Sequence, residues 1–135
     1  MTLKEKGEWN LKLAEILDSR EFLDLPQFQK EYFQIRREHL CSVIINRLYY
    51  GVYLIAKGKL VDKGICKSKG RVLHSGEGCI WDKIMNENCA SEINLAHQLR
   101  NMRNKADYEE GDDTNEIARA KEITLELYNI LKGIE

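Results

Sequence analysis

The chain has 135 residues, of which 43% are apolar and 32% are charged, and its formal net charge is −1. This length fits one domain with a hydrophobic core of its own, and the composition argues against extensive disorder. The near-neutral charge excludes a globally basic nucleic-acid binder, so any such binding must be regional. We therefore expect a single helical domain that spans residues 1–135.

The sequence has no feature of a secreted or membrane protein. No apolar stretch is long enough to span a bilayer, and the first residues, MTLKEKGEWN, lack the apolar core of a secretory signal. We therefore expect a cytoplasmic protein without a membrane partner. The cysteines form no CxxC pair and have no clustered histidines beside them, so we expect reduced thiols, no metal site and no cofactor. They are Cys41, Cys66, Cys79 and Cys89.

With one proline and little strand-like alternation, the sequence predicts an all-α fold, a four- to five-helix antiparallel up-down bundle. The first helix is expected from about Leu3 to Asp18. Its apolar face consists of Trp9, Leu13, Ile16 and Leu17. The second helix begins after Pro26, covers residues 39–58 and stops at Gly58. Because it is apolar around much of its circumference, we expect it at the centre of the bundle.

A basic loop is expected between the second and third helices, over residues 57–71. Its six basic residues either form a solvated surface or bind phosphates or an acidic partner. They are Lys57, Lys59, Lys63, Lys67, Lys69 and Arg71. The third helix is expected to start near Ser75 as its N-cap. The fourth should span Ala90 to Tyr108, and the fifth should start near Asp113 or Thr114.

The fourth helix has a polar segment that allows two interpretations. Arg103 follows the three- and four-residue spacing of the apolar packing positions, so it is expected to be buried and to need an acidic partner. Asp107 lies one turn further on, and Arg47 of the second helix could approach the same carboxylate. In this interpretation Arg47, Arg103 and Asp107 form a structural ion-pair brace.

The second interpretation is a cleft. His97, Arg100, Asn104 and Asp107 also recur at three- and four-residue steps, which places them on one face of the helix. Arginine can bind a phosphate with two hydrogen bonds, and asparagine can orient a base or a water molecule. The two interpretations are compatible, because Arg100 and Arg103 point in different directions.

Three segments, INRLYYGVYLIAKGKL, LHSGEG and RNKADYEE, precede an amphipathic closing helix. In this order they resemble the HEPN family (higher eukaryotes and prokaryotes nucleotide-binding) over residues 40–131. The similarity is greatest to small bacterial and archaeal members with an R..ADY motif. It implies an antiparallel helical bundle, usually a homodimer, often encoded beside a nucleotidyltransferase or within toxin-antitoxin and antiviral defence loci.

Many HEPN relatives are metal-independent endoribonucleases, in which a histidine follows an arginine after four to six intervening residues. Here no histidine follows His97, and the corresponding positions after Arg100 and Arg103 hold other residues. Histidine suits this proton transfer because its pKa lies near neutrality. The leading hypothesis is therefore a protein that acts by association, as a homodimer or as a subunit of an RNA- or nucleotide-related complex.

The alternative hypothesis is an active ribonuclease that uses Arg103 with Asn104 and Tyr108, or with a recruited histidine. His74 or His97 could take this role only if folding or dimerisation brought one of them to Arg103. Tyr108 also has two interpretations of its own. The resemblance implies a possible modification by a partner nucleotidyltransferase, whereas an aromatic ring at a helix end often only packs against the next helix.

Overall fold

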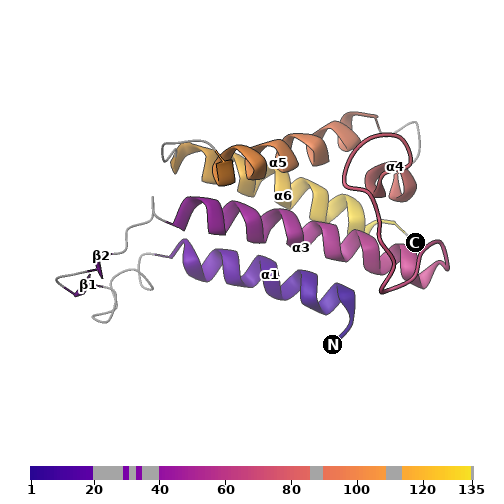
Figure 1. Ribbon diagram of the computed structural model, residues 1–135, viewed down its shortest axis with the longest axis horizontal. Helices are drawn as coiled ribbons and strands as arrows, with labels where there is room; N and C mark the ends of the chain where they lie inside the picture. The colour runs from indigo at the N-terminus through magenta and orange to yellow at the C-terminus, as the bar shows by residue number, and fades with distance from the viewer. Residues whose placement is uncertain (20–28, 31–32, 35–39, 86–89, 109–113, 135) are drawn as a thin grey trace.

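A computed structural model describes residues 1–19, 29–30, 33–34, 40–85, 90–108 and 114–134 of the chain. The predicted all-α class is confirmed, since the described part of the chain is a bundle of helices (Figure 1). Its helices are α1 (Leu3–Leu17), α3 (Cys41–Asp62), α4 (Ile80–Ile84), α5 (Ala90–Tyr108) and α6 (Thr114–Lys132). Two short strands, β1 (Gln29–Lys30) and β2 (Phe33–Gln34), pair antiparallel with each other.

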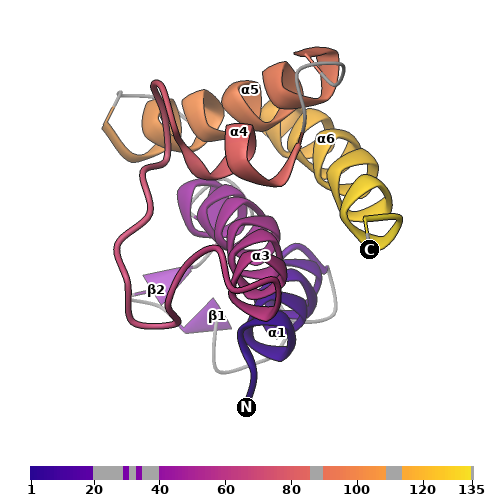
Figure 2. The ribbon, with the colours of Figure 1, turned by 90° about the vertical axis from the view of Figure 1, so that its right-hand side faces the viewer.

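Helix α3 lies at the centre of the bundle, as its apolar circumference predicts. It contacts α1, α4, α5 and α6, and Figure 2 shows it between α1 on one side and α5 and α6 on the other. In Figure 1 the long helices that follow one another in the chain run in opposite directions. Among the described residues, no helix is both long enough and apolar enough to cross a bilayer.

Helices α1 and α3 cross at two glycines. A Cβ atom added to Gly7 would lie 2.6 Å from the carbonyl oxygen of Gly51 and 2.6 Å from Cγ1 of Ile55. Both glycines are buried, so the two backbones approach each other as only small residues allow. The crossing fixes α1 against the central helix over the first half of its length.

The predicted packing face of α1 is only partly right: Leu17 packs against the core, and the other three predicted residues do not. The buried residues of this helix are Gly7 and Ala14, whereas Trp9, Leu13 and Ile16 are 57%, 42% and 50% exposed. The glycine crossing explains the difference, because it turns the small residues of α1 toward α3 and leaves these three large apolar residues outside. Large side chains on the contact face would hold the two helices further apart.

The predicted ends of the second and third helices also differ from the structure. Gly58 does not stop α3, which continues to Asp62, because the glycine is buried where the start of α1 lies against it. The third helix does not start at Ser75. Gly76 and Gly78 adopt positive φ angles of 85° and 74°, which are not helical, and α4 begins only after them. The predicted span of α5 and the predicted start of α6 at Thr114 are confirmed.

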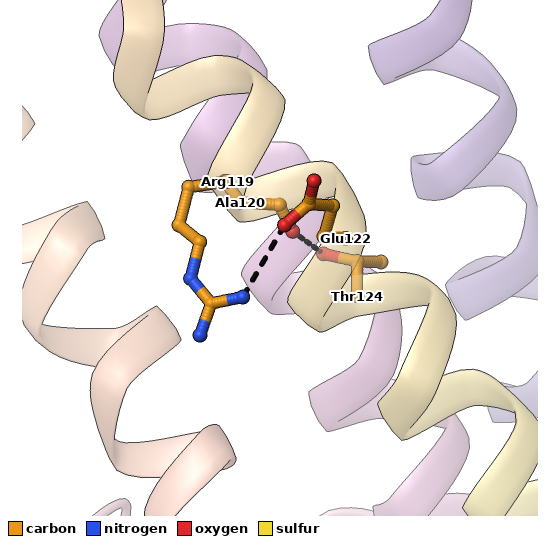
Figure 3. Close-up of polar contacts among 4 residues, drawn as sticks. All are labelled: Arg119, Ala120, Glu122 and Thr124. Atoms are coloured by element: carbon orange, nitrogen blue, oxygen red, sulfur yellow. Dashed lines mark hydrogen bonds and ion pairs between the residues drawn. The ribbon is translucent and has the colours of Figure 1, made fainter.

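A buried polar contact links helix α6 to the C-terminal end of α1. Lys121 donates a hydrogen bond to the carboxylate of Asp18, whose side chain is only 5% exposed. The neighbouring pair of Arg119 and Glu122 is instead exposed to solvent, with an N···O distance of 3.3 Å (Figure 3). The buried hydroxyl of Thr124 donates to the carbonyl oxygen of Ala120 at 2.6 Å within the same helix.

Candidate functional site

Three tyrosines of α3 form the floor of the candidate site. Tyr49, Tyr50 and Tyr53 lie on the same side of the helix, and their rings contact one another. The ring centroids of Tyr49 and Tyr53 are 6.2 Å apart in a stacked arrangement, and those of Tyr49 and Tyr50 are 5.5 Å apart, edge to face. Tyr49 is fully buried and Tyr50 is partly exposed, so this group of rings extends from the core to the surface.

His74 lies on these rings, although it comes from the segment between α3 and α4. Its ring stacks on Tyr53 with a centroid distance of 4.2 Å and an interplanar angle of 14°. Its Nδ1 atom is 2.6 Å from the hydroxyl oxygen of Tyr49. The preceding segment is tied to α3, because the Tyr53 hydroxyl donates to the carbonyl of Val72 at 3.3 Å and Lys57 Nζ donates to the carbonyl of Gly70 at 2.8 Å.

Two arginines of α5 complete the group. The guanidinium carbon of Arg103 lies 5.0 Å from the ring centroid of Tyr50 and 5.7 Å from that of Tyr49, which is within cation–π range. The charge of Arg100 acts on both Tyr49 and His74. We call these six residues the His74 cluster: Tyr49, Tyr50, Tyr53, His74, Arg100 and Arg103.

Burial and positive charge set the protonation states of the cluster. Burial lowers the pKa of His74 below its ordinary value, and the positive charges of Arg100 and Arg103 lower it further. Burial raises the pKa of Tyr49 and outweighs the opposite effect of the nearby positive charges. At neutral pH the cluster therefore contains a neutral imidazole at His74, a protonated phenol at Tyr49 and two guanidinium charges. This combination favours an anionic ligand and offers one group that can exchange protons.

Of the predicted binding residues, Arg100 belongs to this cluster and the six basic residues of the loop do not. Lys57 and Lys59 lie within α3, and Lys59 Nζ donates to the carbonyl of Ile134 at 2.7 Å. Both lysines therefore hold neighbouring segments by hydrogen bonds. The other four basic residues of the loop are exposed: Lys63, Lys67, Lys69 and Arg71. His97 and Asn104 are partly exposed on α5.

Among the described contacts, Arg47 does not form the ion pair that was predicted for the brace. The Arg47 guanidinium donates to Asn10 Oδ1 at 3.0 Å and to Asn46 Oδ1 at 2.7 Å. These bonds direct it to α1, and its partners are amides in place of the expected carboxylate. The side chains of Asp107 and Tyr108 lie outside the described residues, so the predictions for these two stay predictions.

Sequence reasoning found both arginines but missed the tyrosines as the floor of the site. The sequence contained part of this information, because Tyr49, Tyr50 and Tyr53 occupy positions i, i+1 and i+4, which share one side of a helix. His74 had no such signal. His74 lies 25 residues after Tyr49 in the sequence. Only the path of the backbone after α3 places it against the tyrosine rings.

The chain was compared with protein-family models, with curated proteins and with solved structures, and none of them matches it. Within the described ranges, no three histidine, cysteine, aspartate or glutamate side chains are grouped so that they could hold a metal ion. The function is therefore argued from the His74 cluster and from the resemblance of the sequence segments.

Proposed function

We propose that this is an HEPN-like helical protein that acts by association and binds RNA at the His74 cluster. It would work in the cytoplasm as a homodimer, or as a subunit beside a nucleotidyltransferase or defence enzyme in a toxin-antitoxin or antiviral complex. The order of the three resembling segments supports the family. The chemistry of the cluster supports a phosphate-bearing ligand.

One observation carries the proposal: His74 and the Arg103 guanidinium contact one set of tyrosine rings, and the charge of Arg100 acts on the same group. Among the described residues, no carboxylate forms an ion pair with Arg100, and its buried Nε atom has no hydrogen-bond acceptor. A buried donor without an acceptor is costly, and a phosphate oxygen would supply one. Because the chain as a whole is slightly acidic, this local positive charge offers the kind of regional site that RNA binding requires.

RNA binding can be tested with a matched pair of arginine variants. Fluorescence anisotropy with labelled single-stranded RNA at low salt would compare Arg100→Gln with Arg119→Gln. Arg119 is exposed on α6 and pairs with an exposed glutamate. We expect Arg100→Gln to weaken binding about tenfold or more, since charge-assisted hydrogen bonds are lost, and Arg119→Gln to have less than a twofold effect. Equal binding by both variants, or no binding by the wild type, would contradict the proposal.

A second candidate function is that of a metal-independent endoribonuclease, and the position of His74 favours it. This histidine shares the Tyr49 and Tyr50 rings with Arg103, so it could replace the histidine that is missing from the motif. It would take a proton from the attacking ribose hydroxyl or give one to the leaving oxygen, while Arg103 stabilises the phosphate charge. Asn104 and Tyr108 are further candidates for this reaction.

Cleavage is tested separately from binding. The wild type, His74→Ala and Arg103→Ala would be incubated with labelled single-stranded RNA and tRNA in EDTA, after circular dichroism has shown that both variants are folded. Cleavage by the wild type, with none by either variant, would support the ribonuclease function. Binding without cleavage would leave association as the function, and a search for the partner by affinity purification would follow. Tyr108 would then be examined for modification by that partner.

A further inference from the structure

His74 and Trp81 both contact the Tyr49 side chain, and His74 does so at the hydroxyl. His74 Nδ1 is 2.6 Å from it, and the ring of Trp81 on α4 packs edge to face on the Tyr49 ring at 6.3 Å between centroids. Trp81 is fully buried, and its indole Nε1 has no acceptor at hydrogen-bond geometry among the described residues.

The direction of the hydrogen bond between Tyr49 and His74 follows from the chemistry of the two groups. A neutral phenol O–H is a stronger hydrogen-bond donor than the N–H of a neutral imidazole, and the unprotonated imidazole nitrogen is a stronger acceptor than the phenol oxygen. The phenol stays protonated because burial raises its pKa. Its O–H is therefore the group that points to His74, and Nδ1 must accept. In a neutral imidazole the proton is then on Nε2.

We propose that Tyr49 is a positioning residue that holds His74 as the Nε2–H tautomer, so that Nε2 donates a hydrogen bond to a phosphate oxygen of bound RNA. The inference rests on the proposed RNA binding for its ligand. Stacking on Tyr53 fixes the plane of the imidazole ring, and the bond from Tyr49 fixes its rotation within that plane. Nε2 is then the one ring nitrogen left for a ligand.

The inference predicts how the titration of His74 depends on Tyr49. Among the described side chains, the charged or titratable groups that face His74 are Tyr49, Tyr50 and Tyr53 from α3 and Arg100 and Arg103 from α5. A hydrogen bond donated to Nδ1 stabilises the neutral ring and lowers its pKa, in the same direction as the two arginines. Removing the Tyr49 hydroxyl should therefore raise the pKa of His74.

The test compares Tyr49→Phe with Tyr53→Phe in the full chain. Each change removes one hydroxyl and keeps the ring, but the Tyr53 hydroxyl donates to the carbonyl of Val72 and not to His74. Nitrogen-15 NMR of the imidazole would give the tautomer and pKa of His74 in the free protein. Anisotropy with single-stranded RNA would give the affinity.

We expect Nδ1 of the wild type to show the chemical shift of an unprotonated nitrogen that accepts a hydrogen bond. Tyr49→Phe should lose this signature, raise the pKa of His74 and weaken RNA binding about three- to tenfold, whereas Tyr53→Phe should change none of the three appreciably. A proton on Nδ1 in the wild type, or equal effects of the two variants, would overturn the positioning role. If the NMR signatures are as expected but the wild type binds no RNA, then RNA is not the ligand and the proposed function is contradicted.

Discussion

The Tyr49 hydroxyl shows how one buried polar atom can set the chemistry of a site. The ring of Tyr49 is part of the hydrophobic core, and this packing alone gives the residue a structural role. Its hydroxyl contacts the one described histidine that lies beside two arginines. A single residue therefore couples the stability of the core to the protonation of the cluster.

The depressed pKa of His74 has a consequence for stability. The folded protein binds a proton at His74 less readily than the unfolded chain, whose histidine titrates near about 6.5. Below that pH the unfolded state therefore gains more protons, and the free energy of unfolding decreases until the folded-state pKa is reached. His74 thus adds stability above pH 6.5 that is lost on acidification. We expect His74→Gln to lack this loss.

The measurement is urea unfolding of the wild type and His74→Gln between about pH 8 and pH 5. The difference between the two curves removes the contribution of the carboxylates that both proteins share. This difference in free energy of unfolding should change with pH, because the wild type loses stability relative to His74→Gln at the acidic end. A pH-independent difference would show that the surroundings of His74 do not depress its pKa.

At the scale of single residues, the candidate site was only partly predictable. Arg100 and Arg103 were found because helix periodicity places residues on a face without knowledge of the fold. His74 could not be assigned, since its position depends on a non-helical segment shaped by Gly76 and Gly78. The orientation of the Arg47 side chain could not be predicted either, because its hydrogen-bond partner Asn10 lies on another helix.

At the scale of elements, the crossing of α1 and α3 depends on the absence of a side chain. We expect Gly7→Ala to lower the free energy of unfolding by about 1–2 kcal/mol, because the overpacking penalty exceeds the gain in helix propensity. The added methyl group would lie 2.6 Å from the backbone oxygen of Gly51, which cannot move aside as a side chain tip can. Circular dichroism during urea unfolding would measure the change.

Gly133→Ala is the matched control for this prediction. A Cβ atom at Gly133 would lie 3.5 Å from the carbonyl oxygen of Ile130, which is an ordinary contact, and the residue is exposed after the end of α6. Its stability should stay within about 0.5 kcal/mol of the wild type. If Gly7→Ala proved as stable as this control, the close approach of α1 and α3 would be contradicted.

The contact between α1 and α6 supports a second prediction at this scale. Lys121→Gln should destabilise the protein by about 1–2 kcal/mol, because the buried carboxylate of Asp18 loses a charged donor. The half-exposed position of Lys121 keeps the cost below that of a fully buried pair. Arg119→Gln, which removes the exposed ion pair of the same helix, should cost about 0–0.5 kcal/mol. Equal midpoints of urea unfolding for the two variants would contradict the prediction.

The helices themselves were largely predictable, and their faces were not. Periodicity and capping residues gave α5 and the start of α6, because those signals are local in sequence. The face of α1 was predicted from its largest apolar residues, yet Gly7 and Ala14 make its buried contact. Which face a helix buries depends on its neighbour, here on Gly51, and this information is not in the helix's own sequence.

At the scale of the whole molecule, the described helices share one hydrophobic core. Buried residues from α1, α3, α4, α5 and α6 form a single cluster, and the side chains of Cys41 and Cys79 belong to it. Among the described residues, neither of them nor the less buried Cys66 is in a disulfide. The protein should therefore expose Cys41 and Cys79 together, when the common core opens.

Thiol labelling tests this cooperativity. We expect a small alkylating reagent to modify Cys66 of the native protein first, and Cys41 and Cys79 later with similar protection, which decreases in parallel as urea is added. Peptide mapping by mass spectrometry would resolve the three sites. Labelling of Cys79 well before Cys41 would instead show that α4 opens as a unit separate from the rest of the bundle.

The two tryptophans of the chain give the protein a pair of optical reporters. Trp9 is 57% exposed on α1, so its emission should resemble that of an indole in water, whereas Trp81 is fully buried beside Tyr49. Replacing Trp9 by phenylalanine would leave a single fluorophore next to the His74 cluster. Its emission would then follow ligand binding and protonation at the cluster directly, without any added label.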